Sequence, residues 1–433
     1  MTIHINERHK ERAVAVGLSA ASMSEAERSD EQSMDELAAL IETAGGECIA
    51  TVMQNRQSPD PKSFIGEGKL AELKQLIKAN DIELAVFDNE LPPSQMRVLT
   101  EELGIKVLDR SGLILDIFAQ RAKTSEGKLQ VELAQYEYLL PRLTGMWKHL
   151  VRQTASGGAS PIGTRGPGET QLESDRRHIR RRISSLKEDL AHVRSVRSVQ
   201  RRIRERNSMP VVAIVGYTNA GKSTLLNTLT GAQIPARDRL FETLDTTTRK
   251  YKTDDNRGFL LSDTVGFIRK LPTHLVAAFK ATLEELTYAD LLLHVVDITS
   301  EDMQTQIAVV EDLINKLGAG TKPCLLVYNK CDRYMGLLPH GENIVCVSAK
   351  TGEGMPELLD KIFAILSEND HRAVLHLPLN QGALLDLLRR EAAVHSVTYT
   401  EEYIEVCVTV RAELWSRVRG YVADKNGVRC DER

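Results

Sequence analysis

The chain contains one short pattern whose residue types and spacing are suited to binding phosphate. An apolar run at 211–215 leads into G-x-x-x-x-G-K-S, here called the phosphate loop, which comprises Gly216, Tyr217, Thr218, Asn219, Ala220, Gly221, Lys222, Ser223 and Thr224. The two glycines permit backbone angles that let successive N–H groups converge on phosphate oxygens. Lys222 would bridge the β- and γ-phosphates of a nucleotide, and Ser223 would hold Mg²⁺. Taken alone, the stretch leaves open an ordinary turn before a helix.

Three further segments would complete a guanine-nucleotide site, and they contain Asp263, Thr264, Val265, Gly266, Asn329, Lys330, Cys331, Asp332, Ser348, Ala349 and Lys350. In the first, Asp263 can hold Mg²⁺ through water, and the Gly266 N–H can meet the γ-phosphate. In the second, the Asp332 carboxylate can accept two hydrogen bonds from N1 and N2 of guanine, an edge that adenine does not offer. A backbone N–H within 348–350 could meet guanine O6. The order of these segments along the chain is that of GTP hydrolases.

Composition and charge place the protein inside the cell. At 433 residues the chain should hold about three domains. Its net charge of −4 does not suggest a nucleic-acid binder, although such an average hides local patches. The six cysteines are scattered without a C-x-x-C pair, no apolar run is long enough to span a membrane, and the N-terminus is too polar for a signal peptide. We therefore expect a cytoplasmic protein with no transmembrane segment.

The first part of the chain, residues 1–125, alternates strand and helix patterns. Strands are predicted at 13–18, 48–53, 82–87 and 105–108. This alternation predicts a small parallel sheet with covering helices. Ser33 and Glu36 have the spacing of a capping box that would start the first helix. Asp88 and Asp109 stand at the carboxyl ends of strands, where ligands often bind, but turn-forming Asp is the favoured interpretation.

Heptad spacing predicts a helical hairpin over residues 126–207. The seam positions are Leu129, Leu133, Tyr136, Leu140, Leu143, Trp147 and Leu150 in the first arm, and Ile179, Ile183, Leu186, Leu190 and Val193 in the second. The loop between the arms, 157–172, is rich in Gly and Pro, which argues against regular structure there. Two such helices joined by one loop predict an antiparallel pair with arms of about 40 Å. The hairpin would carry this loop far from the flanking domains.

Two features of the hairpin suggest a binding role. Arg165 is the only cation of the loop, within an Arg-Gly-Pro-Gly-Glu-Thr-Gln run that we interpret as a functional tip, with an inert turn as the alternative. The returning arm, Arg176–Arg206, carries twelve Lys or Arg against three acidic residues and includes the run 180–182. A solvated helix face is the usual explanation for such a run. In an acidic protein, however, this local excess favours contact with a phosphate backbone.

Beyond residue 368 the patterns predict a compact β-α-β-β-α domain, which would serve docking or regulation, or else only stabilise the chain. Four domains are therefore predicted: 1–125 (α/β), 126–207 (helical hairpin), 208–368 (GTPase) and 369–433 (α+β). The predicted fold class is α/β. It combines a small parallel α/β domain, an antiparallel helical hairpin, a P-loop GTPase domain with a mostly parallel sheet, and a small α+β domain.

Three stretches together resemble the HflX GTPases, relatives of the Obg GTPases within the translation-factor-related class. They are GTRGPGETQLE at 163–173, the phosphate loop, and DTVGFI at 263–268. The resemblance covers nearly the whole chain after about residue 30, and the Gly-Pro-Gly loop is distinctive of the family. It implies a protein that binds the large ribosomal subunit and its RNA near the peptidyl-transferase region, and that splits or rescues stalled ribosomes under stress. The expected ribosome-binding residues are Arg165, Gly166, Pro167, Gly168, Arg180, Arg181 and Arg182.

The resemblance also identifies a first switch element, formed by Phe241, Glu242, Thr243, Leu244 and Asp245. It implies that Thr243 is a ligand of Mg²⁺ and of the γ-phosphate. The Thr residues at 246–248 offer three rival hydroxyls, so this assignment depends on the resemblance alone.

Phe267 follows the Asp-Thr-Val-Gly segment, at the position where Ras-type enzymes place a water-orienting Gln. A phenyl ring can neither donate nor accept the hydrogen bond that orients the water. Intrinsic hydrolysis is therefore expected to be slow, with the water ordered by the ribosome or by another group. No catalytic base can be named from the sequence.

Two other functions fit parts of the sequence. The protein could be a signalling GTPase whose hairpin grips a protein partner, or an RNA-remodelling factor that uses ATP through its N-terminal domain. No second phosphate loop occurs in residues 1–200, which argues against an independent ATP site. We expect a monomer that binds Mg²⁺ together with GTP or GDP.

Overall fold

The computed structural model describes residues 10–25, 27–143, 167–206, 209–231, 240–241, 247–253, 258–264, 266–272, 275, 284–368, 370–410 and 412–423. The chain divides into two compact units. The first unit contains Met1–Val193, Arg237–Asp245 and Ile268–Lys280, and the second contains Arg194–Ala236, Thr246–Phe267 and Ala281–Arg433. Two short segments of the predicted GTPase domain thus belong to the first unit. The predicted domain boundaries themselves stay a prediction.

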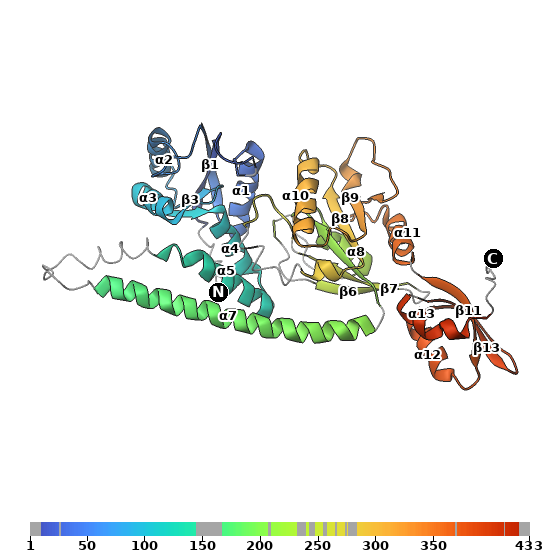
Figure 1. Cartoon of the computed structure of the whole chain (residues 1–433). Coiled ribbons are helices and arrows are strands. Elements are labelled where there is room, and N and C mark those ends of the chain that lie inside the picture. Colours follow the sequence, from blue (N-terminus) through green and yellow to red (C-terminus); the bar gives the residue numbers. More distant parts are fainter. Residues whose placement is uncertain are drawn as a thin grey trace, which may run out of the picture. The chain divides into compact units, whose positions relative to one another are not determined.

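The first unit is built on a parallel four-stranded sheet of order β2-β1-β3-β4 (Figure 1). Its strands are β1 (Arg12–Ala20), β2 (Glu47–Arg56), β3 (Leu84–Phe87) and β4 (Lys106–Asp109). Its helices are α1 (Glu31–Ala44), α2 (Glu67–Ala79), α3 (Pro93–Leu103) and α4 (Arg110–Arg121). Helices α1 and α4 pack together on one face of the sheet, and α2 and α3 on the other. The predicted parallel α/β architecture is confirmed.

The start of α1 differs from the prediction. The N-cap is Asp30, whose carboxylate accepts a hydrogen bond from the Ser33 N–H at 2.7 Å, while Ser33 Oγ accepts one from the Asp30 N–H at 3.0 Å. The capping box is therefore Asp30 with Ser33, and the prediction of Ser33 as the cap is wrong. Asp caps helices as well as Ser does, so the spacing alone did not distinguish the two.

Two helices, α5 (Ser125–Leu139) and α7 (Pro167–Arg206), form the predicted seam. Leu133 of α5 packs against Leu186 and Leu190 of α7, and all three side chains are buried. Helix α5 ends at Leu139, and α7 runs for 40 residues. The seam positions Trp147 and Leu150 lie outside the described residues.

The prediction of an irregular loop up to residue 172 is wrong for its last part, because α7 already begins at Pro167. Proline is well tolerated in the first turn of a helix, where its missing N–H would have had no partner within the helix. Residues 157–166 of that loop lie outside the described part of the chain.

The second unit contains a six-stranded sheet of order β10-β9-β8-β5-β7-β6, parallel except for β6. Its strands are β5 (Val211–Gly216), β6 (Thr247–Lys252), β7 (Gly258–Asp263), β8 (Leu291–Asp297), β9 (Cys324–Asn329) and β10 (Ile344–Cys346). Helices α8 (Lys222–Thr230) and α11 (Met355–Leu366) share one core with the sheet, and α10 (Met303–Lys316) packs on a second cluster. The predicted mostly parallel sheet is confirmed. Strands β5, β7 and β9 end in predicted nucleotide-binding segments, and β10 ends two residues before a fourth.

The C-terminal elements follow the predicted order. They are β11 (His371–Pro378), α12 (Gly382–Glu391), β12 (Ala393–Tyr399), β13 (Tyr403–Val410) and α13 (Ala412–Val418). The strands form an antiparallel sheet of order β11-β13-β12 around its own apolar core. In the described part of the chain, no helix is both long and apolar enough to cross a membrane.

Candidate functional site

The phosphate loop connects β5 to α8, and the backbone at its end requires glycine. Gly221 has a φ of 92°, a left-handed conformation, and serves as the N-cap of α8. A Cβ atom added there would lie only 2.2 Å from the Asn329 side-chain nitrogen. The chain thus turns sharply into the helix N-terminus, a place where backbone N–H groups favour anions.

Lys222 lies buried along this loop. Its ammonium group donates hydrogen bonds to the backbone carbonyls of Gly216 at 3.1 Å and Tyr217 at 2.7 Å. Burial lowers the pKa of Lys222 to about 8, and the nearby Asp263 carboxylate opposes that shift. A buried cation at a helix N-terminus produces a site that would attract a polyanion such as a triphosphate.

Two oxygen ligands suited to Mg²⁺ lie at the same end of the sheet. Strands β5 and β7 are neighbours with Ile214 opposite Asp263, and Ser223 Oγ donates a hydrogen bond to Asp263 Oδ2 at 2.8 Å. Thr264, the residue after Asp263, donates a hydrogen bond from its Oγ1 to the Ile214 carbonyl at 2.6 Å. The described residues contain no cluster of three or more His, Cys, Asp or Glu that could hold a metal ion alone. This donor set fits an ion such as Mg²⁺, which binds proteins through few carboxylates and shares its coordination with phosphates and water.

Residues 263–272, here called the second switch segment, begin at the end of β7, and Phe267 of this segment pairs with Tyr217 of the phosphate loop in an isolated parallel bridge. The Phe267 N–H donates to the Gly216 carbonyl at 3.1 Å, and its carbonyl accepts from the Thr218 N–H at 2.8 Å. Gly266 lies so close that an added Cβ would be 2.9 Å from Thr218 Cγ2 and 3.0 Å from Lys222 Nζ. Thr218 Oγ1 is buried and has no hydrogen-bond partner within the described residues, so a polar atom remains available here for a ligand.

Asn329 joins three of the predicted segments. Its side-chain amide donates to the Ala220 carbonyl at 2.8 Å and accepts from the Ala349 N–H at 2.9 Å. Close by, Ser348 Oγ donates to one Asp332 carboxylate oxygen at 2.7 Å. The structure thus brings the phosphate loop, the segment 329–332 and the segment 348–350 together at one end of the sheet.

Sequence reasoning missed Asp297, which lies at the end of β8. Its carboxylate accepts a hydrogen bond from Lys330 Nζ at 2.6 Å and thereby holds the lysine that precedes the predicted base-reading residues. The signal was available in the sequence, because residues 291–297 read LLLHVVD, an apolar run that ends in an Asp. Such a run is typical of a buried parallel strand with a polar residue at its carboxyl end.

Several predicted site residues cannot be placed. Val265 and the first-switch residues Glu242, Thr243, Leu244 and Asp245 lie outside the described residues. Phe241 is described and belongs to the first unit, where its ring packs edge-on against Phe118 with the centroids 4.8 Å apart. Its role in nucleotide binding stays a prediction.

The predicted ribosome-binding residues fall into three groups. Arg165 and Gly166 lie outside the described residues, whereas Pro167 and Gly168 form the first turn of α7. Arg180 and Arg181 are exposed on α7. Arg182 differs from them, because its guanidinium pairs with Glu132 of α5 at 2.7 Å, and the hydrogen bond to Glu132 raises its pKa.

Three protein-family models together match most of the chain. Residues 31–119 match the model described as GTP-binding GTPase N-terminal, and residues 121–204 match the GTP-binding GTPase Middle Region. Residues 211–330 match the model described as 50S ribosome-binding GTPase.

The chain is also similar to individual proteins. The GTPase HflX of Caldanaerobacter subterraneus subsp. tengcongensis is 45% identical over 416 residues, which cover 96% of this chain and 94% of the relative. The GTPase HflX of Escherichia coli (strain K12) is 43% identical over 398 residues, which cover 90% of this chain and 92% of the relative. Among solved structures, a GTP-binding protein from the hyperthermophilic archaeon Sulfolobus solfataricus in complex with GDP is 26% identical, with a TM-score of 0.42 and coverage of 82% of this chain and 98% of that one.

Proposed function

Since the chain belongs to the HflX family of GTPases, we propose that it hydrolyses GTP in order to act on the large ribosomal subunit, and that it splits or rescues stalled ribosomes. The protein is a GTP hydrolase. The contact of Asn329 with both the phosphate loop and the segment 348–350 is the observation that supports one continuous guanine-nucleotide site. Action on ribosomes implies a cytoplasmic location.

The phosphates would bind along the phosphate loop. The backbone N–H groups after Gly216 and the N-terminus of α8 would surround the β-phosphate, and Lys222 would exchange its two carbonyl partners for phosphate oxygens. The lowered pKa of Lys222 reflects a buried ammonium group, which a phosphate would stabilise in its charged form. Nucleotide binding should therefore raise the pKa of this lysine.

Mg²⁺ would be bound together with the nucleotide. When present, the ion would neutralise charge on the β- and γ-phosphates. Ser223 would supply a hydroxyl ligand, and Asp263, which already accepts a hydrogen bond from that hydroxyl, would orient Ser223 and bind through water. Thr243 is the further ligand implied by the family, and it lies outside the described residues.

Guanine would be recognised by Asp332. Its carboxylate receives the Ser348 hydroxyl on one oxygen, which fixes its orientation for the N1 and N2 donors of the base. Lys330 is held by Asp297 beside it. The Ala349 N–H already donates to Asn329, so its task would be to hold the two base-binding segments together.

Hydrolysis by the free protein would be slow. Phe267 occupies the position of the water-orienting side chain and is itself 1% exposed, so it can contribute only apolar contact. The ribosome would then supply or position the group that orders the water. Rapid GTP hydrolysis by the protein in the absence of ribosomes would contradict this view.

Contact with the ribosome would be made by α7 and the tip that precedes it. The exposed Arg180 and Arg181 lie within the basic arm, which suits a phosphate backbone. Sedimentation with purified large subunits, with and without a non-hydrolysable GTP analogue, tests the proposal. Co-sedimentation that depends on the analogue is expected, and a protein that stays in the supernatant in both cases would favour a signalling GTPase acting on a protein partner.

A further inference from the structure

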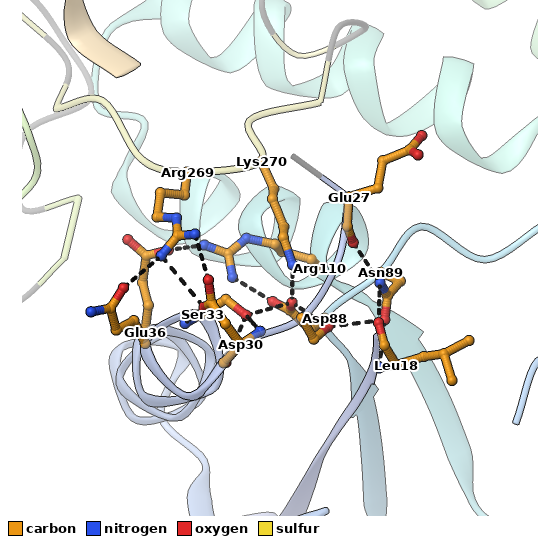
Figure 2. Close-up of polar contacts among 12 residues, drawn as sticks. Leu18, Glu27, Asp30, Ser33, Glu36, Asp88, Asn89, Arg110, Arg269 and Lys270 are labelled. Atoms are coloured by element: carbon orange, nitrogen blue, oxygen red, sulfur yellow. Dashed lines mark hydrogen bonds and ion pairs between the residues drawn. The ribbon is translucent and has the colours of Figure 1, made fainter. Parts of the chain in front are cut away.

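The carboxyl ends of the first unit's strands form a buried polar site around Asp88. The side chain of this residue, which follows β3, is fully buried and accepts hydrogen bonds from Ser29 Oγ at 2.7 Å and Ser33 Oγ at 3.0 Å. It also pairs with Arg110 at 2.7 Å and with Lys270 (Figure 2). The cation Lys270 comes from the second switch segment, far along the chain.

A second cation of the same segment binds beside the first. Arg269 contacts both carboxylate oxygens of Asp30, at 2.7 Å and 3.4 Å, and reaches Gln32 at 3.3 Å. Figure 2 shows Arg269 and Lys270 extending side by side toward the two aspartates. We call the four residues Asp30, Asp88, Arg269 and Lys270 the switch latch.

The latch is held by ion pairs whose charged groups are largely buried from solvent. Burial opposes ionisation of Asp88, but Arg110 and then Lys270 outweigh it and lower the pKa of the carboxyl. Burial lowers the pKa of Lys270, and Asp88 opposes that shift. Only 11% of the Lys270 side chain is exposed, so solvent screens this pair weakly. Leaving the lysine in this place without its carboxylate partner would be unfavourable.

The second switch segment is held at two points. Phe267 bonds to the phosphate loop through its backbone, and only two residues later Arg269 is bound to Asp30 in the first unit. Lys270 has a φ of 54°, a left-handed conformation that is unfavourable for residues other than glycine and persists only where contacts impose it. The latch therefore holds Arg269 and Lys270 within the first unit, two and three positions after Phe267.

Along the latched path, Gly266 packs directly on the backbone of the phosphate loop. A Cβ atom added to Gly266 would lie 3.1 Å from the Thr218 Cα, so a γ-phosphate that is to meet the Gly266 N–H needs this residue to move away from the loop. GDP makes no such demand, because it lacks that phosphate. A ligand that needs the segment displaced has to compete with the contacts that hold it.

From these contacts we propose that Asp30 and Asp88 form a docking site for Arg269 and Lys270, and that GTP, unlike GDP, has to release this latch. The inference rests on the proposed guanine-nucleotide site and adds its regulation by the first unit. Because coupling is reciprocal, the latch weakens GTP binding by the same factor by which GTP weakens the latch.

The test compares affinities for a non-hydrolysable GTP analogue and for GDP, measured by titration with fluorescent nucleotides. In Lys270→Met, analogue affinity relative to GDP should rise about fivefold or more, the range typical of coupled sites. Lys316→Met is the matched control, because it removes an exposed pair with Asp312 on α10, and it should leave the ratio unchanged. Arg269→Gln, which is more exposed, should shift the ratio in the same direction and decides the matter if Lys270→Met does not fold.

Hydrogen exchange of peptides covering residues 268–272, which exclude the Gly266 N–H expected to meet the γ-phosphate, provides the second measurement. In the wild type this segment should exchange faster with the analogue than with GDP, and in Lys270→Met the difference should shrink. An unchanged affinity ratio in both variants, with GDP binding intact, would overturn the latch alone. Failure of the wild type to bind either nucleotide would instead overturn the proposed guanine-nucleotide site.

Discussion

Asp332 is the residue on which discrimination between bases should depend. Its carboxylate is oriented by Ser348 Oγ at 2.7 Å. In Asp332→Asn the charge-assisted hydrogen bonds to guanine disappear, and GTP binding should weaken by roughly 2–4 kcal/mol. Xanthosine triphosphate should bind better than in the wild type, because its C2 oxygen suits an amide donor. Asp312→Asn, an exposed change on α10, is the control for nucleotide titration, and unchanged GTP affinity in Asp332→Asn would exclude it as the base-reading residue.

A second prediction for a single residue concerns His294 and the pH dependence of stability. It is buried in β8, and burial, followed by the Lys222 charge, lowers its pKa to about 4. Below the ordinary histidine pKa of about 6.5, His294 is protonated in the unfolded chain but stays neutral in the folded chain. The free energy of unfolding therefore falls as the pH drops toward 4. From pH 7.5 to 5.5 this group should cost about 1 kcal/mol of unfolding free energy. Urea unfolding of His294→Val should show a correspondingly smaller loss over that interval, and equal pH slopes would contradict the lowered pKa.

At the scale of helices and strands, the spacing of apolar residues predicted the elements correctly where each element buries one face. The parallel strands of both sheets and the order β-α-β-β-α at the C-terminus follow from such patterns. Helix α4 was missed although Leu113, Ile114, Ile117 and Phe118 have helical spacing. Its polar first residues Arg110 and Ser111 are buried, which the apolar pattern does not indicate. The start of α1 was misplaced because Asp30 and Ser33 are both good caps.

For the candidate site, the sequence predicted the motifs but not the side-chain contacts between them. The sequence pointed to Asp263, Asn329 and Asp332, whose types the proposed nucleotide would require. It did not indicate that Asn329 would join three segments, nor that Lys270 would bind Asp88, 182 positions earlier. Contacts of this kind depend on tertiary placement, which local propensity and spacing do not encode.

Helix α7 should contribute the salt dependence of ribosome binding. Removing one cation that binds a phosphate should reduce the slope of log affinity against log salt by about 0.7–0.9. Replacing Arg180 and Arg181 together by Gln should flatten it by up to about 1.8. Arg182→Gln is the matched control on the same helix, since Arg182 pairs with Glu132 and should leave the slope nearly unchanged. Identical slopes for the double variant and the wild type would mean that this charge run is only a solvated face.

On the scale of the whole molecule, α7 leads from the predicted hairpin tip to the strand that precedes the phosphate loop. Its 40 residues span about 60 Å and end at Arg206, shortly before β5 begins at Val211. Deleting residues 163–166 spares Pro167 and the helix. The deletion should leave GTP binding and basal hydrolysis intact but abolish subunit splitting. GTP turnover and splitting, each measured with and without ribosomes, test this, and normal splitting by the variant would refute a role for the tip.

The division of the chain into units also concerns its synthesis. Asp88 is made 182 residues before Lys270, and Phe118 likewise precedes Phe241, yet each pair belongs to the first unit. While the polypeptide emerges from its N-terminus, the parallel sheet can form early, but the partners that cover its acidic edge have not yet been translated. The first domain to emerge is therefore completed only after translation has passed residue 270. A nascent chain paused before that point presents an unfinished edge, which a chaperone could recognise.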